Sequence, residues 1–166
     1  KSQSRFWTLI FLCTILWEAS IKTLAPTVWA NSIISSILLI IPKTFDWCID
    51  QYGFSKHHDN EPWLDFSNEK LGMMGEYIAD DNTMTIYKKY IKNNDDLIET
   101  IIHEYQHYLQ SPTWMERYYN MGYEYDTHPY EIEAEEVVQK DKNKCKKYLN
   151  NAWLVLVFSS IFRYNN

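Results

Sequence analysis

One segment of the chain has the periodicity of an amphipathic helix, and it limits the possible folds and functions more than any other. Its apolar residues recur at helical spacing, at Leu97, Ile98, Ile101, Ile102 and Leu109. The residues before it favour a helix start, at Asn93, Asn94, Asp95 and Asp96. Ser111 and Pro112 follow it and are typical of a helix end. The pattern predicts a helix from about Asp95 to Gln110.

The predicted helix contains the segment HEYQH, from His103 to His107. Residues four apart project from the same face of a helix, so both imidazoles can reach a single zinc ion. Glu104 lies next to them and is poorly placed to be a third ligand. It can instead act as the general base toward a zinc-activated water. The spacing therefore predicts a hydrolytic zinc site.

A catalytic zinc needs a third protein ligand and an open position. The segment HPYEIEAEEVV predicts a second helix that begins near Pro129. Glu131 and Glu135 lie four residues apart on one face of it. We expect Glu131 to be the third ligand and Glu135 to be a carboxylate that orients a ligating histidine. The opposite assignment stays open, as does His128, although a residue before a proline is more typical of a cap or turn.

These two motifs resemble those of the gluzincin group of zinc metallopeptidases, in which HExxH on one helix is completed by a glutamate on a following helix. HEYQH matches the first motif, and the E-x-x-A-E run from Glu131 to Glu135 is similar to the second. The resemblance implies that His103, His107 and Glu131 bind Zn²⁺. It also implies that Glu104 is the general base, that Glu135 has the orienting role, and that the substrate is a peptide or protein.

The resemblance covers about residues 63 to 149 and carries two further expectations. Members of the group usually stabilise the oxyanion with a nearby histidine, tyrosine or arginine, for which Tyr123 and Tyr125 are candidates. The strand before the HEYQH helix, expected at Thr83–Tyr90, would bind an extended peptide as an added strand.

The region before the helix predicts a β-hairpin. Its two runs are Glu76–Ala79 and Thr83–Tyr90, and the turn formers Asp80–Asn82 join them. The expected fold is therefore α+β and zincin-like. It has a small sheet or hairpin, then the HEYQH helix, and then a second helix that bears the third ligand. We expect this domain to occupy residues 42–166.

The first 41 residues are expected to form one or more apolar helical segments. Residues 6–17 and 23–42 carry no charge, and Glu18 and Lys22 lie between them. The segments are either buried against the rest of the chain or associated with a membrane. A further apolar run, Trp153–Phe162, is too short to span a bilayer and indicates a core helix or an interfacial segment.

Charge and cysteine content exclude some classes of function. The formal net charge of -6 disfavours nucleic acid as a partner, because such binding needs a basic stripe. The three cysteines, at positions 13, 48 and 145, form no CxxC pair, which favours a reducing, cytoplasmic compartment. Membrane association through residues 1–41 and a single bridge between Cys48 and Cys145 stay open.

Three other functions are compatible with the same motifs. The first is a zinc hydrolase that acts on a non-peptide bond. The second is a non-catalytic protein in which zinc joins two helices for stability or interaction. The third is a membrane-associated interaction protein in which HEYQH is incidental. Metal content and substrate profiling distinguish among them.

Overall fold

The computed structural model describes residues 28–69 and 72–163 of the chain. The chain divides into two compact units, Lys1–Ser36 and Ile37–Asn166, and each is considered by itself. The apolar stretch at 6–17 and the first residues of the stretch at 23–42 lie outside the described residues. Within the described ranges, no helix combines the length and the apolar character needed to cross a bilayer. The site discussed below lies entirely within the second unit.

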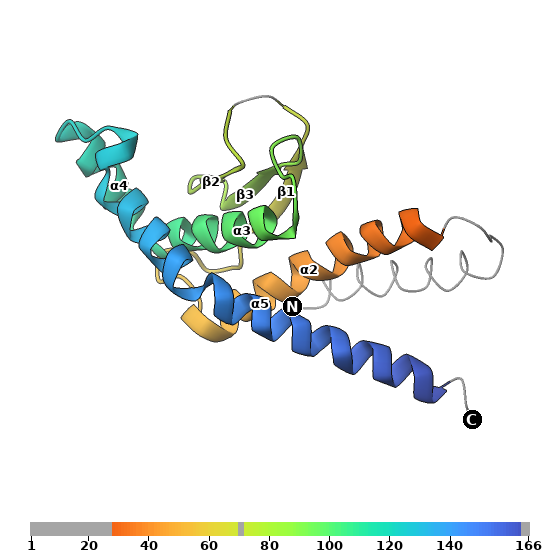
Figure 1. Cartoon of the computed structure of the whole chain (residues 1–166). Helices are drawn as coiled ribbons and strands as arrows, with labels where there is room; N and C mark the ends of the chain where they lie inside the picture. The colour runs from red at the N-terminus through yellow and green to blue at the C-terminus, as the bar shows by residue number, and fades with distance from the viewer. Residues whose placement is uncertain (1–27, 70–71, 164–166) are drawn as a thin grey trace. The chain divides into compact units, whose positions relative to one another are not determined.

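The described residues have an α+β fold, as predicted, with four α-helices and a three-stranded mixed sheet. The elements in chain order are α2 (Val28–Tyr52), β1 (Trp63–Ser67), β2 (Gly75–Ile78), β3 (Thr83–Tyr87), α3 (Asn94–Leu109), α4 (Pro112–Asn120), the 3-10 helix η1 (Tyr125–Thr127) and α5 (Pro129–Arg163). Figure 1 shows α3 against the sheet and α5 running past α3.

The predicted hairpin is confirmed. Strands β2 and β3 are antiparallel, with Ile78 opposite Thr83 and Gly75 opposite Ile86. The turn between them places Asn82 at a φ of 47°, a left-handed conformation that asparagine tolerates better than most residues.

Strand β1 was not predicted. It pairs in parallel with β3, so that the sheet order is β1-β3-β2. A parallel neighbour is joined through a crossover rather than a tight turn, so no short-range signal in the sequence identifies it. Its five residues also lack a regular alternation of buried and exposed positions.

The central place of β3 corrects one expectation. The strand expected to accept an added peptide strand was Thr83–Tyr90, but β3 is already paired on both sides, with β1 and with β2. A strand with two neighbours has no free backbone edge. The free edges of this sheet belong to β1 and β2.

Helix α3 confirms the prediction for residues 95–110, and its ends explain why. Asn93 is the N-cap, and its side chain accepts a hydrogen bond from the backbone N–H of Asp96 at 2.9 Å. Gln110 ends the helix. Pro112 then begins α4, which was not predicted. Proline both stops one helix and is suited to the first turn of the next, so a helix end was expected where a second helix also starts.

The core of the second unit lies around α3. Its fully buried residues Ile101, Ile102 and Tyr105 pack in one cluster with Met84 of β3 and Val138 of α5. Residues of α2 from Ile40 onward join this cluster. Packing against the sheet, α5 and α2 holds α3 in place. The face of α3 that carries the histidines therefore has a defined position.

The border expected between residues 41 and 42 falls inside α2, which continues through Pro42. The helix predicted from Pro129 is confirmed as α5, and the apolar run Trp153–Phe162 lies within the same 35-residue helix. Cys48 of α2 and Cys145 of α5 are both buried, free thiols, so the bridge between them is not formed. Cys13 lies outside the described residues.

Candidate metal centre

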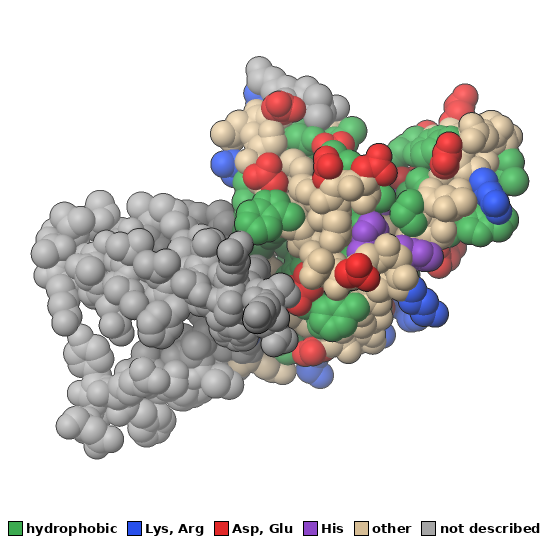
Figure 2. All heavy atoms as spheres, turned by 180° about the vertical axis from the view of Figure 1, so that it is seen from behind, with side chains coloured by type: hydrophobic (Ala, Val, Ile, Leu, Met, Phe, Trp, Pro, Cys, Tyr) green, Lys and Arg blue, Asp and Glu red, His purple; other side chains and the backbone are tan. Residues whose placement is uncertain are grey.

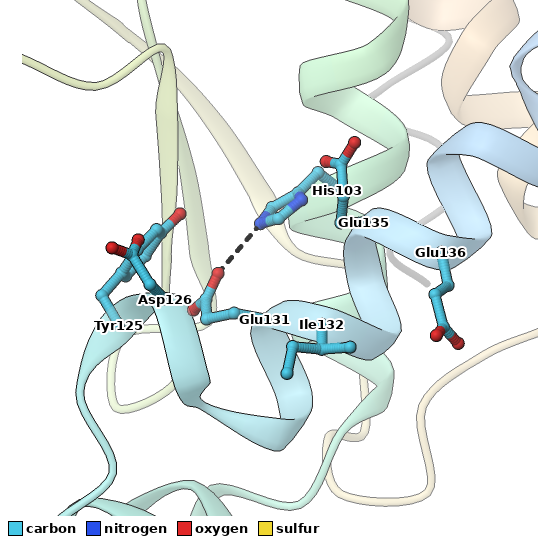
Figure 3. Close-up of a pocket in the computed structure, with 7 residues that line it drawn as sticks. All are labelled: His103, Tyr125, Asp126, Glu131, Ile132, Glu135 and Glu136. Atoms are coloured by element: carbon cyan, nitrogen blue, oxygen red, sulfur yellow. Dashed lines mark hydrogen bonds and ion pairs between the residues drawn. The ribbon is translucent and has the colours of Figure 1, made fainter.

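Helices α3 and α5 bring His103, His107 and Glu131 together. The Nε2 atom of His103 lies 3.2 Å from Oε2 of Glu131, and Nε2 of His107 lies 3.3 Å from Oε1 of the same carboxylate. The two Nε2 atoms are 3.1 Å apart. Figure 3 shows the contact between His103 on α3 and Glu131 in the first turn of α5. Among the described residues, these three form the only group with the arrangement of a metal site.

The spacing of these atoms fits zinc. Zinc bonds of 2.0–2.2 Å in a tetrahedron place neighbouring ligand atoms about 3.3 Å apart. The three distances in the cluster, from 3.1 to 3.3 Å, agree with this value. Two imidazole nitrogens and one carboxylate also form a ligand set that is typical of catalytic zinc and leaves a fourth position open. His103, His107 and Glu131 could therefore hold a metal ion, and Zn²⁺ stays the predicted one.

The first turn of α5 carries Glu131, and the turn after it carries Glu135. Side chains four residues apart on a helix can reach one point, but here it is the carboxylate of Glu131 that contacts both imidazoles. Glu135 lines the cavity beside His103 (Figure 3) and is exposed. Its carboxylate accepts a hydrogen bond from Gln139 at 2.6 Å. The structure thus brings Glu131, and not Glu135, into the cluster.

His128 lies outside the cluster. Its side chain is fully buried, and its Nδ1 atom accepts a hydrogen bond from the backbone N–H of Tyr130 at 3.2 Å. Its backbone carbonyl accepts from Ile132 at 3.1 Å, and its Nε2 atom faces the carbonyl oxygen of Met115 at 3.4 Å. His128 therefore caps the start of α5, and both ring nitrogens have partners away from Glu131.

Glu104 is buried beside the cluster, with only 6% of its surface exposed. Burial raises the pKa of its carboxyl to about 7, although the nearby imidazoles of His107 and His103 act in the opposite direction. A general base works best when its pKa lies near the operating pH. The position and the raised pKa of Glu104 are both suited to the role predicted for it.

A glycine allows β2 to approach this part of α3. A Cβ atom on Gly75 would lie 2.6 Å from Cγ2 of Thr100 and 3.1 Å from Cγ of Glu104. The first of these distances is a clash. Gly75 therefore lets the edge strand β2 lie directly against the helix that carries Glu104.

The carboxylate of Glu131 and the ring of His107 stabilise each other's charged forms. Burial raises the pKa of Glu131, but hydrogen bonds and charge from His103 and His107 outweigh it and hold that pKa far below its ordinary value. Burial lowers the pKa of His107, and Glu131 and Glu104 raise it by more. A metal cation can take the place of the protons that bind here, because it interacts with the same lone pairs.

Gln110 was not among the predicted site residues. Its Oε1 atom lies 2.8 Å from Nδ1 of His107, and its Nε2 atom reaches α5. The orienting partner of His107 is thus Gln110, which lies seven residues after His103, two helical turns along the same face of α3. That spacing is the signal that would have revealed it. The orienting role of Glu135 toward a ligating histidine stays a prediction.

The two tyrosine candidates occupy different places. Tyr125 of η1 lines the same cavity as His103 and Glu131 (Figure 3). Burial, followed by the negative charge of the nearby Glu131, raises the pKa of Tyr125 well above its ordinary value, so its hydroxyl keeps its proton beyond neutral pH. Tyr123 instead packs edge-on against Tyr118, at 5.7 Å between ring centroids. The structure brings only Tyr125 to the site.

Two depressions adjoin the cluster. The first, of about 310 Å³, is lined by His103, Tyr125, Asp126, Glu131, Ile132, Glu135 and Glu136. The second, of about 530 Å³, extends from His107 between the end of β2 and helix α4. In Figure 2 histidine side chains lie in a notch with acidic and hydrophobic side chains around it. Among the described residues, neither lining includes a lysine or an arginine.

Comparisons with protein-family models, with curated proteins and with solved structures find no match to this chain. The candidate site therefore rests on its own geometry.

Proposed function

We propose that this protein is a zinc-dependent hydrolase, and specifically a metallopeptidase. The observation that carries the proposal is the convergence of His103, His107 and Glu131 at distances suited to zinc, with the buried carboxyl of Glu104 beside them. A structural zinc site does not require an adjacent general base, whereas a hydrolytic one does.

Each residue around the site has a defined role in the proposed reaction. His103, His107 and Glu131 would hold the zinc, which would supply a Lewis acid that lowers the pKa of a water molecule toward about 7. Glu104 would take a proton from the attacking water and pass it to the leaving amine. Tyr125, protonated at neutral pH, donates a hydrogen bond to the oxygen on which negative charge develops.

The edge strand β2 is the proposed place for the substrate backbone. In the part of the chain that the structure describes, β2 is an edge strand paired with β3, and its contact with α3 at Gly75 brings it close to Glu104. The groove that reaches His107 continues along the end of β2, at Tyr77–Asp80. An extended peptide that pairs with β2 would present one carbonyl to the metal and its following side chains to the groove.

We also propose a zincin-like arrangement for the fold. Two observations support it: the HEYQH helix packs against the sheet beside its antiparallel edge strand, and the next long helix supplies a glutamate to the same point. The glutamate on the following helix is the feature that the resemblance to gluzincins implies.

The proposal is tested by measuring zinc content and peptide cleavage together. Purified wild type should bind about one zinc per chain and cleave members of a mixed peptide library. Glu104→Gln should keep the zinc and lose cleavage, because only the general base is removed. His107→Ala should lose both. Zinc binding without cleavage of any peptide would contradict the hydrolase, and wild type without affinity for zinc would contradict the metal centre.

A further inference from the structure

Gln110 links the two helices that carry the metal ligands. Its backbone is the C-cap of α3, and its N–H donates to the carbonyl oxygens of Gln106 and His107 at 3.0 and 3.2 Å. Its side chain is 9% exposed and extends toward α5. Both parts of the residue are therefore held in place.

The contacts of the Gln110 amide determine which way it points. Its Nε2 atom donates to the backbone carbonyl of Tyr130 at 3.1 Å and to a carboxylate oxygen of Glu133 at 3.0 Å. A carbonyl and an ionised carboxylate only accept hydrogen bonds, so the NH₂ group and not the oxygen must face them. The oxygen Oε1 is then left facing Nδ1 of His107, at 2.8 Å.

This orientation selects one tautomer of His107. An amide oxygen can only accept, so Nδ1 of His107 must carry the proton. The neutral ring then has its lone pair on Nε2, which is the atom that lies 3.1 Å from Nε2 of His103.

We propose that Gln110 is a positioning residue that holds His107 with its proton on Nδ1 and presents Nε2 to the metal. The same amide ties the end of α3 to the first turn of α5, where Glu131 lies. This inference rests on the metal centre of the proposed function, and it does not require that the protein hydrolyse anything.

A neighbouring glutamine provides the comparison. Gln106 lies one turn earlier on α3 and is equally buried, at 8% exposed, but its Nε2 atom has no hydrogen-bond partner in the described part of the chain. Burial alone therefore does not give the amide nitrogen of a glutamine here a hydrogen-bond partner. The contacts of Gln110 follow from its position between His107 and α5.

The test uses Gln110→Met and the matched control Gln106→Met. Methionine keeps the length and approximate volume of the side chain and removes the amide donors and acceptor, so both variants retain packing. Zinc affinity is measured by competition with a chromophoric chelator. In the zinc-loaded proteins, NMR records the Nδ1–H proton of His107 and its exchange with water. Unfolding curves of the zinc-free proteins report the purely structural effect.

The expected result is a loss of zinc affinity in Gln110→Met of about 10- to 100-fold, as is typical when the outer partner of a histidine ligand is removed. Its Nδ1–H proton should also exchange faster or disappear. Gln106→Met should bind zinc as wild type does and keep the protected proton.

Equal zinc affinities in the two variants would overturn the inference, and so would a protected Nδ1–H proton that persists in Gln110→Met. Neither readout depends on cleavage. If wild type cleaves no peptide but Gln110→Met still binds zinc more weakly than Gln106→Met, only the hydrolase is contradicted. If wild type is active but the two variants bind zinc equally, only the role of Gln110 is contradicted.

Discussion

The Nε2 atoms of His103 and His107 lie 3.1 Å apart, and the planes of the two rings meet at 78°. Two nitrogen lone pairs directed at one point repel each other unless a proton or a cation lies between them. The i, i+4 spacing on α3 makes this approach possible, and burial of the opposite helix face prevents the helix from turning to relieve it. The two imidazoles therefore form one candidate site for a shared proton or metal cation.

The choice of Glu131 over Glu135 as third ligand gives the first prediction. Glu131→Gln should weaken zinc binding by more than about a hundredfold, which exceeds the usual effect of losing an outer partner. Glu135→Gln removes the same charge one turn farther along α5 and should cost less than Glu131→Gln, at most the roughly 10- to 100-fold typical of losing a residue that orients a ligating histidine. Titration calorimetry with zinc measures both. A larger loss in Glu135→Gln than in Glu131→Gln would reverse the assignment.

The two tyrosines provide a matched pair for the oxyanion role. Tyr125→Phe removes the hydroxyl of the tyrosine that lines the cavity beside His103, and kcat for a cleaved peptide should fall by about a hundredfold, the loss typical of one oxyanion donor. Tyr123→Phe should leave kcat unchanged, because Tyr123 packs on Tyr118 away from the cavity. Zinc content is measured in both variants, so that a drop in kcat with full zinc assigns the effect to the hydroxyl. Equal rates for the two variants would remove Tyr125 from the mechanism.

The contact between Gly75 and Thr100 predicts a defined packing defect. Gly75→Ala should reduce the free energy of unfolding by about 1–3 kcal/mol, because the new Cβ would lie 2.6 Å from Cγ2 of Thr100. Thr100→Ser removes that methyl group and should recover part of the loss in the double variant. Urea unfolding of the two single variants and the double variant measures the coupling. Strictly additive effects would mean that β2 and α3 do not touch as described.

Asp141 of α5 predicts an acid-dependent contribution to stability. Burial raises the pKa of its carboxyl, but hydrogen bonds from Lys144 and from the hydroxyl of Tyr52 outweigh it and lower that pKa below the ordinary value of 3.8. A carboxylate with a depressed pKa stabilises the folded state above the unfolded pKa and loses that effect as pH falls through the folded pKa.

Asp141→Asn should therefore be less stable than wild type by about 1 kcal/mol at neutral pH, a typical net value for a lost hydrogen bond. The difference should shrink as the pH falls below 3.8. Asp95→Asn is the control, since its carboxylate is 61% exposed in its pair with Lys146 and such pairs contribute little. Thermal unfolding across pH measures both. A difference for Asp141→Asn that grows on acidification would contradict the expected sign of the pH dependence.

Local sequence was sufficient for the elements that carry the site. The N-cap at Asn93, the apolar period of α3 and the proline at position 129 depend only on residues within one or two turns, so they could be recognised without any tertiary contact. The same is true of the β2–β3 hairpin, because its strands are neighbours in the chain. The i, i+4 spacing of His103 and His107 also follows from helix geometry alone.

Other features depended on contacts between distant parts of the chain. Strand β1 was missed because its partner β3 lies across a crossover, and the edge position of β2 follows from that same pairing. Helix α4 was missed because Pro112 is equally suited to a helix stop and to a helix start.

By itself, the sequence determined that two histidines and a glutamate would share one face of α3 and that acidic residues would follow on a second helix. Only the tertiary structure decided which of those acids meets the histidines, that Gln110 rather than Glu135 bonds to His107, and that Tyr125 rather than Tyr123 reaches the site. The physical reason is that helical periodicity is a property of neighbouring residues, whereas the registry of α5 against α3 is set by packing of the core between them.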